Sequence, residues 1–131
     1  MKNFVIAVVI STVLSLAHSA QAANPSGVWT WVSDINGQTR QCSVKLRLDS
    51  EGSVLSGFYF DDQVERGIAI PPAVFYHEDP KINFLITREY KGDKHSLRCV
   101  GTFNGDFISG VMYVETGGDV KSANWTARRQ Q

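Results

Sequence analysis

Apolar and polar residues alternate with a period of two along most of the chain beyond residue 22. In the run 39–48, the apolar residues all fall on one side of an extended backbone: Cys42, Val44, Leu46 and Leu48. The residues between them are Ser43, Lys45 and Arg47. Such alternation is typical of a β-strand with one buried face, and no run has helical spacing. The pattern therefore predicts an all-β protein.

Turn sequences separate these runs at short intervals. They are Asn36-Gly37, Glu51-Gly52, Lys91-Gly92-Asp93, Asn104-Gly105-Asp106 and Gly117-Gly118-Asp119. The runs between them are 27–34, 39–48, 53–60, 63–70, 73–77, 82–90, 94–103 and 107–115, with a ninth at 121–129. Glycine-containing turns between alternating runs indicate antiparallel hairpins. Pro71 and Pro72 interrupt the fourth and fifth runs, so we expect one of these two to be an edge segment or a loop, with the prolines where no ladder hydrogen bond is needed.

A sheet built from these runs has one apolar face and two free edges. Closing it into a barrel buries the face and hides the edges, so we predict an antiparallel up-and-down β-barrel of about eight strands. The sets predicted to line the interior include Leu97, Cys99, Gly101 and Phe103; Ile82, Phe84, Ile86 and Arg88; and Ile108, Gly110, Met112 and Val114. Glycines on these inward faces, such as Gly57 and Gly110, allow strands to coil tightly where a barrel bends.

Residues 52–59 resemble residues 105–112. In both segments a turn glycine leads into an aliphatic residue, then Ser-Gly, then apolar residues. The hairpin at 29–40 aligns loosely with 84–95. One interpretation is a chain of two similar halves, each a small meander. The other is that all antiparallel meanders reuse the same turn sequences, and the sequence does not choose between them.

The two ends of the strand region carry a short motif. Gly27-x-Trp29 lies on the first predicted strand, and Trp125 and Arg128 lie on the last. This arrangement resembles the signature of the calycin group, which comprises the lipocalins, fatty-acid-binding proteins, avidins and a class of bacterial secreted metalloprotease inhibitors. The resemblance implies that Trp29 closes one end of the barrel and that Arg128 packs across its indole, a stable arrangement for a guanidinium. The chain lacks both lipocalin-length loops and the polar ligand-contacting series of avidins.

The first 22 residues have the form of a bacterial signal peptide. Lys2 supplies a positive start, an apolar run follows, and Ala20-Gln21-Ala22 has the small-x-small form that signal peptidase cuts. We therefore expect residues 23–131 to form a single exported domain, periplasmic or secreted, without stable membrane insertion. The 13 basic and 13 acidic residues of the chain balance, which gives no electrostatic footprint for nucleic acid.

The two cysteines, Cys42 and Cys99, both lie in the predicted mature domain. An even pair in an oxidising compartment is more often bridged than free. Alternation points both side chains inward, on strands that lie opposite each other in a round barrel and come together in a flattened one. We predict that the disulfide forms, which requires a Cα separation of about 5.5–6 Å.

The most interesting polar residue is Arg88, which alternation places inward. An arginine inside a barrel can bind a carboxylate or phosphate as a bidentate fork. Alternatively, it lies at the barrel rim, paired with Glu65 or Glu89. The other candidates for a ligand site are aromatic or soft apolar residues: Trp31, Tyr59, Tyr90 and Met112. They either line a pocket for a small apolar ligand or simply fill the core, because an eight-stranded barrel can do either.

Some apolar residues fall on the outward face. Phe58 and Phe60 alternate opposite Leu55, Gly57 and Tyr59, and Val111 and Tyr113 form a similar pair. Such residues can form a partner or dimer surface. Alternatively, a bulge returns them to the core.

Catalytic motifs are weak. His77 and His95 lie in separate segments, Asp61 and Asp62 fall on a turn and are expected to be solvated, and no cluster has metal-ligand spacing. We therefore expect a non-catalytic binding protein without metal or cofactor, holding a small or amphipathic molecule in its lumen. The alternatives are a protein-binding module, such as a barrel-type protease inhibitor acting from its rim or N-terminal arm, and a self-associating barrel with a filled core.

Overall fold

The computed structural model describes residues 24–35, 37–62, 66–76, 78–90 and 92–131. The predicted signal peptide, residues 1–22, lies outside these ranges. The described chain folds into eight strands: β1 (Gly27–Ile35), β2 (Gln38–Leu48), β3 (Val54–Asp61), β4 (Ile68–Val74), β5 (Lys81–Tyr90), β6 (Asp93–Asn104), β7 (Phe107–Thr116) and β8 (Asp119–Arg129). The all-β prediction and the number of strands are both confirmed.

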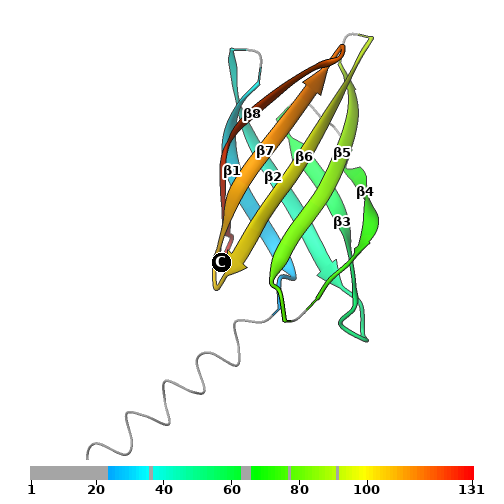
Figure 1. The fold of residues 1–131 in the computed structure, drawn as a ribbon, viewed down its shortest axis with the longest axis vertical. Helices are drawn as coiled ribbons and strands as arrows, with labels where there is room; N and C mark the ends of the chain where they lie inside the picture. The colour runs from blue at the N-terminus through cyan, green and yellow to red at the C-terminus, as the bar shows by residue number, and fades with distance from the viewer. Residues whose placement is uncertain (1–23, 36, 63–65, 77, 91) are drawn as a thin grey trace, which may run out of the picture.

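The strands form one antiparallel sheet that curls into a nearly closed barrel (Figure 1). Their order is β4-β3-β2-β1-β8-β7-β6-β5, so the first and last strands are neighbours at the middle of the sheet. Each half, β1–β4 and β5–β8, is a meander of sequential hairpins. The barrel closes where β4 comes alongside β5, and no ladder joins these two strands within the described residues.

The two predicted runs on either side of the prolines are a single strand, β4. Its ladder with β3 steps from Leu55↔Ala73 to Gly57↔Ile70, so Pro71 and Pro72 together face one residue of β3. Two residues opposite one is a β-bulge, where a residue without a backbone N–H removes no ladder bond. The prolines therefore interrupt the ladder but not the strand, and they lie on the strand at the open margin of the sheet.

The interior follows the predicted alternation. On β6 the inward residues Leu97, Cys99, Gly101 and Phe103 are buried, and on β5 so are Ile82, Phe84 and Ile86. The core continues across β1, β2 and β3 through residues such as Trp29, Val44 and Tyr59. Apolar burial of this extent is the main favourable contribution to folding.

Two inward glycines occupy equivalent places in the two halves. A Cβ atom added to Gly57 would collide with the carbonyl oxygen of Lys45 on β2, and one added to Gly110 would collide with that of Val100 on β6. At both places only glycine permits the neighbouring strand to approach so closely. The repeated Ser-Gly sequence thus has the same physical role in β3 and β7.

Candidate functional site

One end of the barrel is closed by Trp29, which is fully buried. Its indole Nε1 donates a hydrogen bond to the carbonyl oxygen of Pro25, 2.8 Å away. The edge of its ring meets Phe103, with the ring centroids 6.2 Å apart and the planes at 82°. The described N-terminal arm is fixed here too, because Ser26 Oγ accepts a hydrogen bond from the backbone N–H of Leu48 at 2.9 Å. Trp29 therefore has the closing position that the family resemblance implies.

The cation over this indole is Arg129, and the assignment to Arg128 is wrong. The guanidinium carbon of Arg129 lies 4.5 Å from the centroid of the Trp29 ring. Arg128 is exposed and lies over the ring of Phe107 on the outer face, at 5.6 Å. Adjacent residues of a strand point to opposite faces, so an error of one position moves the side chain out of the barrel.

Arg88 is buried inside the barrel, as alternation predicted, and it forms an ion pair with Asp61 of β3. Glu65, one of the partners considered for Arg88 at the rim, lies outside the described residues. The Tyr59 hydroxyl donates a hydrogen bond to Oδ2 of the Asp61 carboxylate at 2.8 Å. The expectation that Asp61 is solvated is therefore wrong. Alternation contained the missing signal, because Tyr59 and Asp61 share one face of β3 and both are buried.

The cysteines are free thiols, so the predicted disulfide is absent from this structure. Cys42 Sγ lies 3.1 Å from Ser33 Oγ and 3.5 Å from the Tyr59 hydroxyl oxygen. Burial raises the pKa of the Cys42 thiol, although the hydrogen bonds from Ser33 and Tyr59 oppose this. Burial also raises the pKa of Cys99, with a smaller contribution from Cys42. Both thiols therefore stay protonated at neutral pH.

Two further polar side chains are buried close to the β1–β2 and β5–β6 turns. Arg40, on the same face of β2 as Cys42, is 4% exposed. His95, at the start of β6, has Nδ1 2.9 Å from the hydroxyl of Thr116. Neither was predicted as an interior residue, although the period of two extended from Cys42 and Leu97 includes both. Together with Arg88, Asp61 and Ser33 they are the buried polar side chains of the described structure.

Aromatic rings line the middle of the lumen. Trp125 meets Trp31 and Phe84 edge to face, with centroids 5.6 Å apart in both pairs. Trp31 also contacts Tyr59, at 6.1 Å. Neither the Trp31 nor the Trp125 indole nitrogen has a hydrogen-bond partner among the described residues, and both atoms are buried. Of the other predicted ligand residues, Met112 is buried, and the Tyr90 side chain lies outside the described part of the chain.

A cavity of about 300 Å³ lies where β1 and β8 separate. It is lined by the β1–β2 hairpin around Asp34, by Met112 and Val114 of β7, and by Lys121, Ser122 and Ala123 of β8. Met112 belongs to the buried core, so this cavity reaches the inner wall of the barrel. Its volume is at the lower end of the range for small-molecule sites.

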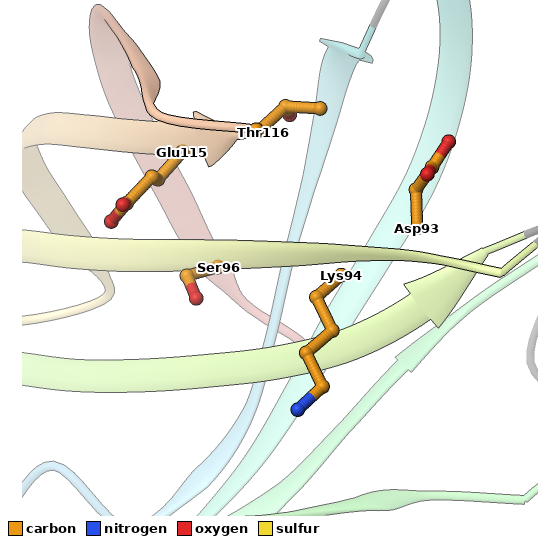
Figure 2. Close-up of a pocket in the computed structure, with 6 residues that line it drawn as sticks. Asp93, Lys94, Ser96, Glu115 and Thr116 are labelled. Carbon is orange, nitrogen blue, oxygen red and sulfur yellow. The ribbon is translucent and has the colours of Figure 1, made fainter.

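Two further depressions lie on the outer face of the barrel. The larger, about 520 Å³, follows the end of β7 and the start of β6, where the side chains of Asp93, Lys94 and Glu115 point apart (Figure 2). The second, about 390 Å³, lies across β5 to β8 between Leu85, Arg98, Tyr113 and Val120. Since the polar groups do not converge in the larger depression, it has no arrangement for binding a particular ligand.

Known proteins add no constraint to this picture. No protein-family model matches the chain, and no characterised protein or solved structure matches it either. Among the described residues, no three His, Cys, Asp or Glu side chains are grouped to hold a metal ion, and no helix is long and apolar enough to span a membrane.

The Asp61 carboxylate and the Cys42 thiol are both engaged with other side chains inside the barrel. The carboxylate of Asp61 already forms an ion pair and accepts a hydrogen bond, so it is poorly placed to take a proton from a substrate. The Cys42 thiol has a raised pKa, whereas a nucleophilic cysteine needs a lowered one. The middle of the lumen is aromatic, and the indole N–H groups of Trp31 and Trp125 are buried there without a partner among the described residues.

Proposed function

We propose that this protein is an exported, non-catalytic β-barrel that holds a small amphipathic molecule in its lumen. The observation that carries the proposal is the pair of buried indole N–H groups, on Trp31 and Trp125, without an acceptor in the described structure. A buried donor left without a partner costs about 1–3 kcal/mol, so most native proteins provide one. A bound molecule that accepts hydrogen bonds from the indole N–H groups of Trp31 and Trp125 removes this cost.

The surroundings of the two indoles define the chemistry of the ligand. Arg88 is neutralised by Asp61 and is therefore a weak candidate for a second, external anion. The walls near Trp125 are Phe84, Trp31 and the apolar side of β7. The ligand that fits is a largely apolar molecule with a hydrogen-bond acceptor such as a carbonyl or hydroxyl oxygen. Of the predicted ligand residues, Arg88 is therefore not included in this proposal.

The three tryptophans allow a matched test. The neutral naphthalene ketone prodan has an apolar body and one carbonyl acceptor, and its emission reports its surroundings. We expect the mature protein to bind prodan with blue-shifted emission. Trp31→Phe and Trp125→Phe should each weaken binding about five- to thirtyfold, the worth of roughly one hydrogen bond. Trp29→Phe is the control, because its indole N–H already has an acceptor in Pro25.

Two results bear on the proposal in opposite ways. A small molecule that co-purifies with the protein and is released in native mass spectrometry would support it directly. No binding of prodan by wild-type protein, with no co-purified molecule, would contradict it. Equal weakening by all three substitutions would point to a general loss of packing.

A second candidate function is self-association through the outer face of β3 and β4. Five large apolar side chains are exposed on these strands or directly after β4: Val54, Phe58, Phe60, Val74 and Tyr76. Phe58 and Phe60 point outward as alternation predicted, with 51% and 39% of their surfaces exposed. Apolar clusters of this kind mark contact surfaces. The alternative of a protease inhibitor acting from its N-terminal arm is less favoured, because Arg129 hydrogen-bonds the backbone of Asn24 and Ser26.

Sedimentation of the mature protein over a wide concentration range tests self-association. We expect a reversible dimer that the double substitution Phe58→Ser and Phe60→Ser converts to a monomer, while Phe107→Ser, an exposed phenylalanine on β7, leaves it intact. A wild-type protein that stays monomeric at the highest concentration would eliminate this candidate.

A further inference from the structure

The contact between β1 and β8 is much shorter than either strand. Its ladder consists of Trp29↔Arg129 and Thr30↔Arg128. Each strand stays paired on its other side, β1 with β2 as far as Ile35↔Gln38 and β8 with β7 back to Thr116↔Asp119. The strands are thus intact beyond Thr30, and they diverge from one another as two edges. In this region the barrel wall has a lateral opening.

Side-chain exposure on β8 shows that the inward face of this strand is accessible at the opening. Lys121 and Ala123 share the inward face of β8 with Trp125 and Ala127, since strand residues two apart point the same way. Trp125 and Ala127 are buried, whereas Lys121 and Ala123 are exposed. The inward face therefore becomes accessible where β1 has moved away. Across the ladder, Ala123 lies beside Met112 and Lys121 beside Val114.

We infer that the lumen ligand enters sideways, through the opening between β1 and β8, with its acceptor group leading towards Trp125. This inference rests on the proposed function and adds the route and the binding orientation. Going inward along β8, the exposed Ala123 is followed on the same face by Trp125, whose indole nitrogen has no partner in the described structure. The apolar part of the ligand then lies over Met112, Val114 and Ala123, which line the 300 Å³ cavity.

Entry through the end of the barrel that Trp29 closes, its floor, is blocked. Trp29 and Pro25 are buried there, and Arg129 joins three parts of the chain by donating to the carbonyl oxygens of Ser26, at 2.6 Å, and Gly105, at 2.9 Å. At the lateral opening, by contrast, the charged residues Asp34 and Lys121 form no ion pair with each other in the described structure. Passage between them breaks no such contact.

The first part of the test measures the opening without any ligand. Val114 is half-buried on the cavity wall, so Val114→Cys introduces a thiol there, and the two native thiols are buried. We expect a maleimide to label the folded Val114→Cys variant at least about tenfold faster than wild type. Adding Ala123→Phe, which fills the opening, should slow this labelling. Labelling no faster than wild type would overturn the inference, because the wall would then be closed.

The second part measures entry of prodan by stopped-flow fluorescence. We expect Ala123→Phe to lower the association rate at least about tenfold. The control is Thr102→Phe, at an exposed threonine on the outer side of β6, which should leave the rate unchanged. Urea unfolding of both variants verifies that they are folded. An association rate in folded Ala123→Phe equal to that of wild type would overturn lateral entry while leaving the proposed function intact.

The remaining outcome separates the two proposals. Rapid labelling of Val114→Cys together with no prodan binding by wild type would overturn the proposed function, and the entry route with it, although the opening itself would be real. Protection of the introduced thiol of Val114→Cys by bound prodan is the positive result that supports both.

Discussion

The guanidinium of Arg129 lies over the indole of Trp29, with 4.5 Å between the guanidinium carbon and the ring centroid. These two residues come from the last and the first strand, and they are paired across the β1–β8 ladder. The same guanidinium forms an ion pair with Asp106, at 3.2 Å, in the turn between β6 and β7. One side chain thus joins the N-terminal arm, the C-terminal strand and a hairpin turn at the floor of the barrel.

Replacing this side chain should weaken the fold far more than replacing its neighbour. We expect Arg129→Met to lower the free energy of unfolding by about 2–4 kcal/mol, from the lost charged hydrogen bonds and the cation–π contact. Arg128→Met should change it by about 0.5 kcal/mol or less, since that residue is exposed. Urea denaturation measures both. Equal effects of the two substitutions would mean that the floor contacts contribute little.

The buried ion pair between Arg88 and Asp61 should show a strong asymmetry. Arg88→Met leaves a buried carboxylate without its cation and should cost about 3–5 kcal/mol. Adding Asp61→Asn should recover a large part of this loss, because the amide is uncharged and its oxygen still accepts from Tyr59. Chemical denaturation of the two variants provides the comparison. An Arg88→Met protein as stable as wild type would show that the pair is not desolvated in solution.

The state of the cysteines in the purified protein can be measured directly. The structure leads us to expect two free thiols that react slowly with Ellman's reagent when folded, since burial raises the pKa of both. Unfolding should release two reactive thiols per chain. A disulfide would instead give none without reductant, together with a mass lower by two hydrogens, and would restore the bridge predicted from the sequence.

Stability should fall at alkaline pH. A group whose pKa is raised by folding contributes fully below its unfolded pKa, and this contribution is lost as the pH rises above it. For thiols the loss begins near about pH 8.5, with a slope of about 1.4 kcal/mol per pH unit for each thiol that keeps its proton. Denaturation under reductant between pH 7 and 10 measures this slope, and Cys99→Ala should reduce it. An unchanged slope in that variant would exclude Cys99 as a cause.

The barrel was predictable because its physical basis is local. Period-two alternation records which face is dry, and glycine turns record where the chain reverses, as in the segments that became β2 and β6. The inward positions of Arg88 and Met112 follow from the same count. Strand pairing across the β1–β8 contact was inferred from the motif at the two ends of the chain, and it is found.

The predictions that were wrong or incomplete depend on the exact register of a strand or on which strands face each other across the lumen. Arg128 and Arg129 are both cations at the end of β8, so only the register of the strand decides which lies over Trp29. The partner of Arg88 depends on how β3 and β5 face each other across the lumen, which no local pattern specifies. Joining the runs around Pro71 and Pro72 into one strand required a bulge, and the sequence signalled only an interruption.

The two meanders meet along two lines that are weaker than the rest of the sheet. One is the short β1–β8 ladder, and the other is the approach of β4 to β5, which the described structure leaves without a ladder. Separating any other pair of neighbouring strands breaks a much longer ladder. The barrel can therefore widen along these two lines while every hairpin stays intact. The two meanders are the units that would move relative to each other. Amide hydrogens along these two lines should be the first in the barrel to exchange with solvent.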